Sequence, residues 1–153
     1  MLDLLSSSRE NKVGKNYLVQ HSAGSGKSLT IAWLAHRLIN LFDEDSNRVY
    51  DAVIVLTDRR VLDKMLREII RSLSAVLGVF VPAGDDGVRL KDALEGDAQI
   101  ITSTIQKFPF VRGLANQLST KKFALVVDEA HASQSGELVR AVQDRLGTEG
   151  TEE

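Results

Sequence analysis

The sequence predicts an α/β fold in which a parallel β-sheet is covered by helices on both faces. Short, continuously apolar segments alternate along the chain with longer ones whose apolar residues recur every three or four positions. The first pattern is typical of strands buried on both faces, and the second of amphipathic helices. Because the two patterns alternate, the strands should be parallel and joined by helical crossovers. A chain of 153 residues is the size of one domain, which we expect to span residues 16–147 between a flanking segment, 1–15, and a polar tail, 148–153.

Each expected element has its own local signal. The clearest strand is an unbroken apolar run bounded by Asp51 and Asp58, and the clearest helix carries leucines at three- and four-residue spacing. Ser103 and Gln106 have the spacing of a capping box, so a helix should begin at Ser103. The expected strands are residues 16–20, 52–56, 78–81, 99–102 and 123–127. The other expected helices are residues 27–42, 59–77, 88–94 and 137–146, with loops at 43–47 and 82–87.

Composition and charge exclude several classes of protein. Hydrophobic residues are 43% and charged residues 26% of the chain, which is ordinary globular usage and argues against disorder. Without cysteine, the chain has no disulfide, thiolate ligand or thiol nucleophile. A net charge of −2 does not suit a protein that binds nucleic acid through bulk charge, so any such contact should be local. No apolar run approaches the ~18 residues of a membrane span, and the first residues lack the basic start of a signal peptide, so we expect a cytoplasmic protein with no membrane partner.

A glycine-rich segment, Ser-Ala-Gly-Ser-Gly-Lys-Ser, lies between the first expected strand and the first expected helix. Gly24, Ser25 and Gly26 could turn successive backbone N–H groups onto a phosphate, to which the helix N-terminus adds a favourable dipole. Lys27 would reach the β- and γ-phosphates of a nucleotide, and the Ser28 hydroxyl would bind Mg²⁺. The alternative is a glycine-rich turn with a lysine on its rim. The strand before and the helix after favour a nucleotide site.

An acidic segment, Asp-Glu-Ala-His, follows directly on the expected strand 123–127. Acids at the carboxyl end of a strand are where an open α/β sheet usually carries its site. Asp128 suits the role of holding Mg²⁺ opposite Ser28. Glu129 suits the role of orienting and polarising the attacking water. His131 is either a polar surface residue of the loop or a link between the nucleotide and a neighbouring lobe.

These motifs resemble those of superfamily 2 helicases and translocases, which carry them on the first of two RecA-like lobes. The match is closer to the motor of type I restriction enzyme R subunits, which also have a histidine where His21 replaces the first glycine of the phosphate loop. The segments that carry it are residues 18–28, 31–36, 57–63, 104–108 and 127–136. The resemblance implies a P-loop NTPase fold, ATP and Mg²⁺ as cofactors, and movement along double-stranded DNA without strand separation. It also implies a second RecA-like lobe, a methylase subunit and a specificity subunit as partners, and a parent protein that is an ATP-dependent type I site-specific deoxyribonuclease.

The resemblance also implies residues that contact DNA, and it assigns His131 to coupling between nucleotide and lobe. Arg59 and Arg60 would touch DNA phosphates, but their helix interleaves basic and acidic residues, so a solvated face with ion pairs is the alternative. Thr102, Ser103, Thr104 and Gln106 would touch the DNA backbone, with helix capping by Ser103 as the equal alternative. Trp33 should be a core residue rather than a platform for stacking bases.

The sequence departs from the resembled family at several points. Met65 stands where the family usually has glutamine, and no glutamine precedes Gln20 to read adenine. The family's third motif, its second lobe and its nuclease domain are not in these 153 residues. We therefore expect a fragment of the motor that hydrolyses ATP barely or not at all. Two alternatives stay open: a lobe of another superfamily 2 DNA or RNA helicase, and a non-catalytic nucleotide-binding remnant.

Overall fold

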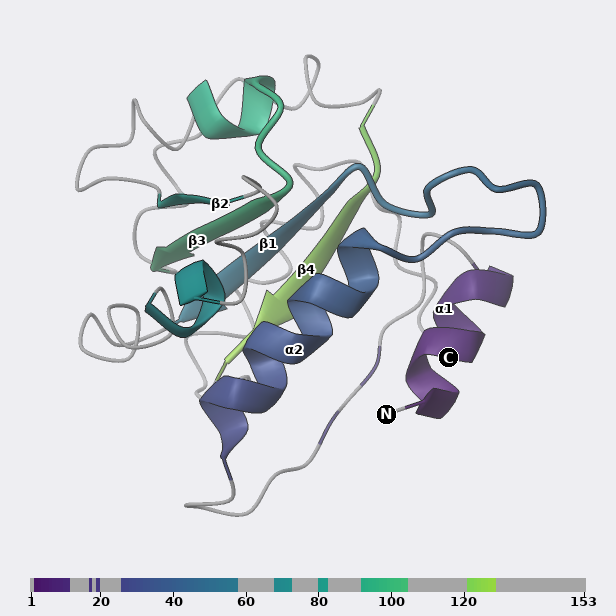
Figure 1. The fold of residues 1–153 in the computed structure, drawn as a ribbon, viewed down its shortest axis with the longest axis horizontal. Helices are drawn as coiled ribbons and strands as arrows, with labels where there is room; N and C mark the ends of the chain where they lie inside the picture. The colour runs from purple at the N-terminus through teal and green to yellow at the C-terminus, as the bar shows by residue number, and fades with distance from the viewer. Residues whose placement is uncertain are drawn as a thin grey trace.

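The computed structural model describes residues 2–11, 17, 19, 26–57, 68–72, 80–82, 92–104 and 121–128. Figure 1 shows its elements, which are the helices α1 (Leu2–Asn11) and α2 (Lys27–Ile39) and the strands β1 (Ala52–Thr57), β2 (Phe80–Pro82), β3 (Ile100–Thr104) and β4 (Phe123–Val127). Residues 68–72 and 92–95 are also helical. The expected helix 137–146, the tail 148–153 and loop residues 83–87 lie outside the described residues.

The described strands form one parallel sheet in the order β2-β3-β1-β4. Strand β1 lies between β3 and β4, with Val53 opposite Ile100 on one side and Ala124 on the other. Every residue of β1 is buried, so both faces of this strand are covered, as its unbroken apolar run predicts. The predicted α/β class with a parallel sheet is confirmed.

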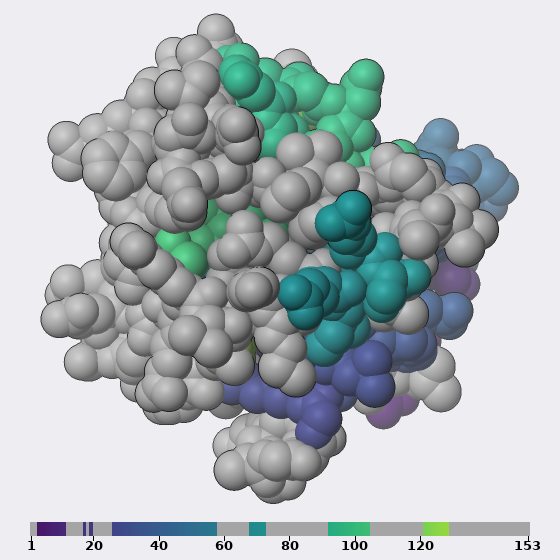
Figure 2. Space-filling view, turned by 60° about the vertical axis from the view of Figure 1, so that its left-hand side comes forward, coloured from purple at the N-terminus to yellow at the C-terminus, as the bar shows by residue number. Residues whose placement is uncertain are grey.

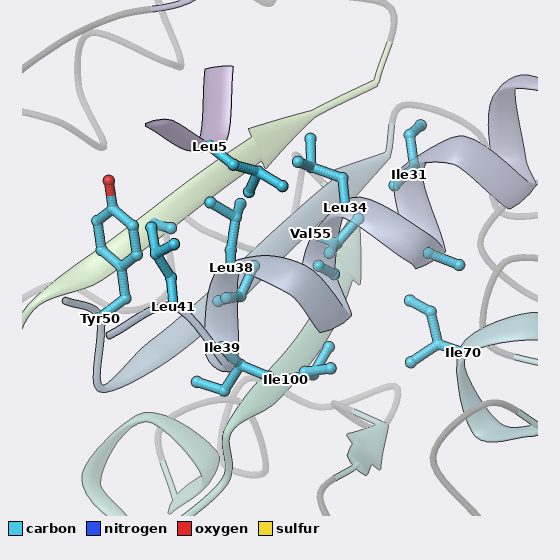
Figure 3. Packing of buried hydrophobic residues seen from close by; sticks show 14 of the residues in the cluster. Leu5, Ile31, Leu34, Leu38, Ile39, Leu41, Tyr50, Val55, Ile70 and Ile100 are labelled. Atoms are coloured by element: carbon cyan, nitrogen blue, oxygen red, sulfur yellow. The ribbon is translucent and has the colours of Figure 1, made fainter. Parts of the chain in front are cut away.

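A hydrophobic cluster of the described residues lies between α2 and one face of the sheet (Figure 3). Apolar side chains of α2 at helical spacing meet Val53 and Val55 of β1, which point to the same face because strand side chains alternate. Ile70, from residues 68–72, joins the same core, and Figure 2 shows this segment beside α2 at the surface. The α2 residues in the core are Ile31, Ala32, Leu34, Ala35, Leu38 and Ile39. Burial of a leucine or isoleucine of this kind contributes about 1.5–3 kcal/mol.

Helix α2 ends at Ile39, three positions before the expected end. The side-chain amide of Asn40 donates a hydrogen bond to the His36 carbonyl oxygen (2.9 Å), which closes the last turn of α2. Phe42 then forms an antiparallel bridge with Arg48. The expected acidic loop lies between them, where Asp43 Oδ1 accepts hydrogen bonds from the backbone N–H groups of residues 45 (3.1 Å) and 47 (2.9 Å).

The N-terminal region differs from the prediction, because residues 1–15 contain a helix rather than a plain flanking segment. Helix α1 contributes Leu5, which is 6% exposed and packs into the core under α2. The strand expected over residues 16–20 is not formed at Tyr17 or Val19, the residues of that range that the structure describes. The Tyr17 hydroxyl is instead within hydrogen-bond distance of Ser7 Oγ (3.0 Å), which links Tyr17 to α1.

Two further expectations are corrected. Strand β3 runs through Thr104, so Ser103 is a buried strand residue and not a helix cap, because the segment pairs with β1 to its end. Trp33 is 40% exposed rather than core, with the Arg37 guanidinium 5.4 Å from its ring centre. Strand β4 is buried only at Ala124, since it has one neighbour in the described sheet. No helix among the described residues is long and apolar enough to cross a membrane.

Candidate nucleotide-binding site

The carboxyl ends of the parallel strands meet at one edge of the sheet. Thr57 ends β1, Thr104 ends β3, and Asp128 follows β4. The backbone N–H of Asp128 donates to the Leu56 carbonyl oxygen (2.9 Å), which continues the pairing of β4 with β1 by one residue. Asp128 therefore lies beside the end of β1 and is 5% exposed. This edge is where an open α/β sheet binds its ligands.

The N-terminus of α2 reaches the same edge. Gly26 precedes the helix with φ of 80° and ψ of 28°, in the left-handed region that favours glycine. A Cβ at this position would meet no atom within 4 Å, so the backbone angle and not lack of space calls for glycine. The carbonyl oxygen of Gly26 accepts the first helical hydrogen bond, from the Thr30 N–H (3.0 Å). The first turn holds no acidic residue, so its N–H groups keep their partial positive charge.

The central contact of the site joins α2 to β4. Lys27 Nζ lies 2.6 Å from Asp128 Oδ1, with the lysine side chain 34% and the aspartate side chain 6% exposed. Figure 1 shows the start of α2 near the arrowhead of β4, which is how residues so far apart in sequence meet. Within the described residues Asp128 Oδ1 accepts no hydrogen bond, although Lys27 Nζ is so close. The contact is a close ion pair between a partly exposed lysine and a nearly buried aspartate.

The oxygen atoms at this edge suit a magnesium ion. Mg²⁺ prefers hard oxygen ligands, commonly one or two carboxylates with hydroxyl, phosphate or water oxygens. The Asp128 carboxylate is nearly buried and has an oxygen without a hydrogen bond among the described residues. Ser28, in the first turn of α2, is half-buried and follows Lys27 directly. This donor set fits the metal.

The structure brings together part of the predicted site. Gly26, Lys27, Ser28 and Asp128 gather at the carboxyl edge of the sheet. Thr104 reaches that edge but is 2% exposed, so a contact with DNA there would need its surroundings to move. The other predicted site residues, Gly24, Ser25, Arg59, Arg60, Gln106, Glu129 and His131, lie outside the described residues.

Sequence reasoning missed the buried hydroxyl group of Thr57 at this edge. Thr57 is 0% exposed, and its Oγ1 atom has no hydrogen-bond partner in the described part of the chain. Thr102, one of the residues expected to touch DNA, is 1% exposed in the middle of β3, and its Oγ1 atom is likewise without a partner among the described residues. The signal was present, because Thr57 ends an otherwise apolar run and polar residues end β3 as well. Polar residues that close buried strands lie at the edge where ligands bind.

The parallel sheet, the helix across it and the site at its carboxyl edge define an α/β lobe of the RecA-like class. The family model described as SWI2/SNF2 ATPase matches residues 3–149, so the chain belongs to the SWI2/SNF2 ATPase family. Membership of this family implies the use of ATP.

The curated relatives support the more specific resemblance. The chain is 29% identical over 139 residues to the type I restriction enzyme SauCOLORF180P endonuclease subunit of Staphylococcus aureus (strain COL), covering 88% of this chain and 14% of that protein. It is 28% identical over 141 residues to the SsaAORF53P endonuclease subunit of Staphylococcus saprophyticus, with the same coverage of 88% and 14%. The chain thus spans a small part of the length of these relatives. No solved structure matches the chain.

Proposed function

We propose that this chain is the ATP-binding lobe of an ATP-dependent motor that moves double-stranded DNA in a type I restriction system. The observation that carries the proposal is the ion pair of Lys27 and Asp128 at the N-terminus of α2. A lysine, a helix N-terminus and a carboxylate at the carboxyl edge of a parallel sheet are the parts that nucleotide phosphates require. The restriction-enzyme relatives support the choice of this motor over other ATPases.

Nucleotide binding would begin with an exchange of partners at Lys27. The Lys27 side chain is 34% exposed, so a phosphate in solution can reach its ammonium group. The β- and γ-phosphates would take the place of the Asp128 carboxylate, while backbone N–H groups of the first turn of α2 would donate to phosphate oxygens. Gly24, Ser25 and Gly26 would complete the loop around the phosphates.

Ser28 and Asp128 would hold Mg²⁺ beside the phosphates, where the ion supplies positive charge against the developing negative charge of phosphoryl transfer. Asp128 becomes available for this role once Lys27 has turned away. Glu129 would orient and polarise the attacking water. His131 would couple the nucleotide state to a neighbouring lobe.

The remaining parts of the motor would come from outside this lobe. A second RecA-like lobe would supply the arginine that stabilises the transferred phosphoryl group, a contribution of roughly 10³–10⁵ in rate. Arg59, Arg60, Thr104 and Gln106 would contact the DNA backbone. Methylase and specificity subunits would direct the parent protein to its sites, and the relatives' description as endonuclease subunits supports this setting.

A calorimetric titration with Mg-ATP tests the proposal. We expect binding by the wild-type chain with similar affinities for ATP and GTP, because no glutamine precedes Gln20 to read adenine. Lys27→Ala should abolish the binding heat, since it removes the cation that faces the phosphates. Lys122→Ala is the matched control, because Lys122 is exposed at the opposite end of β4. Absence of binding by the wild type, or equal binding by Lys27→Ala, would contradict the proposal.

A further inference from the structure

Thr57 has an unusual environment for a hydroxyl group. It is the last residue of β1 and is 0% exposed, yet its Oγ1 has no hydrogen-bond partner in the described part of the chain. Buried hydroxyl groups are nearly always hydrogen-bonded, and each exception calls for a reason. A threonine without a partner can be retained because it acquires one in another state of the site.

The register of the sheet shows which group could be that partner. Leu56 pairs with Val127, so the next residues on the two strands, Thr57 and Asp128, are neighbours across β1 and β4. Adjacent strands lie about 4.7–4.9 Å apart. Val55 is in the core under α2, so Thr57, two residues further on, points to the same face.

The side chain of Asp128 points to that face as well. Val126, two residues before it, packs against the core under α2, and Lys27 reaches the carboxylate from the first turn of α2. Thr57 Oγ1 and Asp128 Oδ1 are thus both without a hydrogen bond in the described residues, on the same face of neighbouring strands. The Thr57 hydroxyl can donate a hydrogen bond, and the Asp128 carboxylate can accept one.

We propose that Thr57 is a positioning residue, whose hydroxyl donates a hydrogen bond to the Asp128 carboxylate when Lys27 turns toward phosphate; this rests on the proposed function above. With Lys27 in place, the ammonium group 2.6 Å away balances the carboxylate charge. When that cation leaves, a carboxylate that is only 5% exposed needs other favourable contacts. The neighbouring hydroxyl supplies one and fixes the orientation in which Asp128 presents its remaining oxygen to Mg²⁺.

Thr102 provides a matched control within the same sheet. Its Oγ1 is also buried and also without a partner in the described residues. Its register partner is Val55, whereas the partner of Thr57 in β3 is Thr104 at the end of the strand. Thr102 therefore lies two residues further from the edge that carries Asp128, on the far side of β1 from β4. Loss of its hydroxyl should change packing without changing the response to Mg²⁺.

The test measures ADP affinity of the full chain with Mg²⁺ and with EDTA, using a fluorescent ADP analogue. Thr57→Val keeps the shape of the side chain and should weaken binding about fivefold to twentyfold in Mg²⁺, because one hydrogen bond to a charged group is lost. In EDTA the same variant should lose clearly less affinity, because no metal then depends on the orientation of Asp128. Thr57→Ser should restore the Mg²⁺-dependent affinity to within about twofold, and Thr102→Val should keep the wild-type ratio.

Several results would overturn the assignment of Thr57 as a positioning residue. A loss of affinity for Thr57→Val that is equal in Mg²⁺ and in EDTA would mean a structural role, as would a failure of Thr57→Ser to restore binding. An unchanged Mg²⁺ response in Thr57→Val would also overturn it, and Thr57→Ala gives a second hydroxyl-free variant if Thr57→Val does not fold. A wild-type chain that binds no nucleotide would defeat the proposed function itself, which is a result distinct from all of these.

Discussion

The ion pair of Lys27 and Asp128 can be tested without any nucleotide. We consider the stability of Lys27→Met, Asp128→Asn and the double variant in a buffer free of Mg²⁺ and nucleotide. Lys27→Met leaves the Asp128 carboxylate, 6% exposed, without its cation. Asp128→Asn leaves Lys27, 34% exposed, with access to water. The two single changes should therefore differ in cost, the lysine change being the larger.

The size of the effect follows from the two exposures. Breaking a fully buried pair by removing one partner costs about 3–5 kcal/mol, whereas exposed pairs contribute about 0.2–1 kcal/mol. The Lys27–Asp128 pair lies between these limits, because solvent screens the lysine but hardly reaches the aspartate. We expect about 2 kcal/mol for Lys27→Met and about 1 kcal/mol for Asp128→Asn. The double variant should be close to Asp128→Asn, giving a coupling free energy of about 2 kcal/mol.

Urea unfolding followed by tryptophan fluorescence is a suitable assay. Trp33 is the single tryptophan and lies on α2, the helix that carries Lys27. The midpoint should fall in the order wild type, Asp128→Asn, Lys27→Met, with an unchanged slope. A coupling free energy near zero, or a Lys27→Met variant as stable as the wild type, would refute the reasoning that the buried carboxylate depends on this cation.

Three further predictions concern other parts of the chain. Lys121 Nζ lies 3.2, 3.2 and 2.5 Å from the carbonyl oxygens of Leu94, Glu95 and Gly96. Urea unfolding should therefore show that Lys121→Met lowers the unfolding free energy by about 1–2 kcal/mol. A loss no larger than that of Lys122→Met would contradict this prediction. Burial raises the pKa of Tyr50 above 10.0, an effect that a hydrogen bond with Ser8 partly offsets. The Tyr50 hydroxyl therefore loses its proton at a lower pH in the unfolded chain than in the folded chain. The contribution of neutral Tyr50 to the free energy of unfolding is complete below pH 10 and is lost as the pH rises through the folded pKa. Between pH 9 and pH 11 the free energy of unfolding should therefore fall less for Tyr50→Phe than for the wild type. Equal falls in the two proteins would refute this prediction. In a phosphate-release assay the 153-residue chain should hydrolyse ATP far more slowly than about 1 s⁻¹, since the arginine of a second lobe contributes roughly 10³–10⁵ in rate. Hydrolysis near about 1 s⁻¹ that is lost in Glu129→Gln would show that this chain completes its own site.

The sequence was most informative where one physical cause dominated. The unbroken apolar run of β1 could only be buried on both faces, and its position inside the sheet confirms this. The helix after the glycine-rich segment begins at Lys27, where the motif placed its start. The distance between Lys27 and Asp128 could not be predicted, since it depends on how α2 crosses the sheet. Only the topology brings the ends of these two elements together.

The errors came from local signals that longer-range packing outweighed. Ser103 and Gln106 have the spacing of a capping box, but pairing with β1 carries β3 through Thr104, and β-branched residues suit a strand. Trp33 was expected in the core because of its size. The core face of α2 follows Ile31, Leu34, Leu38 and their neighbours, and position 33 lies off that stripe, so the periodicity would have predicted its exposure.

Helix α1 was not predicted, because its helical signal in the sequence is weak although one of its residues packs in the core. Three serines in succession, residues 6–8, dilute the helical pattern, and serine is only a moderate helix former. Leu2 and Leu5 at three-residue spacing, with Asp3 in the first turn and Arg9 in the last, were the available evidence. Packing of Leu5 into the core under α2 stabilises the helix, and that contact is not visible in the sequence.

Every role proposed for this site requires Lys27 to bind the terminal phosphates of a nucleotide at the N-terminus of α2. Phosphorus NMR of Mg-ADP, titrated with the wild-type chain and with Lys27→Ala, measures that contact at the phosphate itself. We predict that the β-phosphate resonance shifts and broadens on addition of the wild type and is unchanged by Lys27→Ala. A β-phosphate resonance that the wild type leaves unchanged, or that Lys27→Ala shifts equally, would contradict the account.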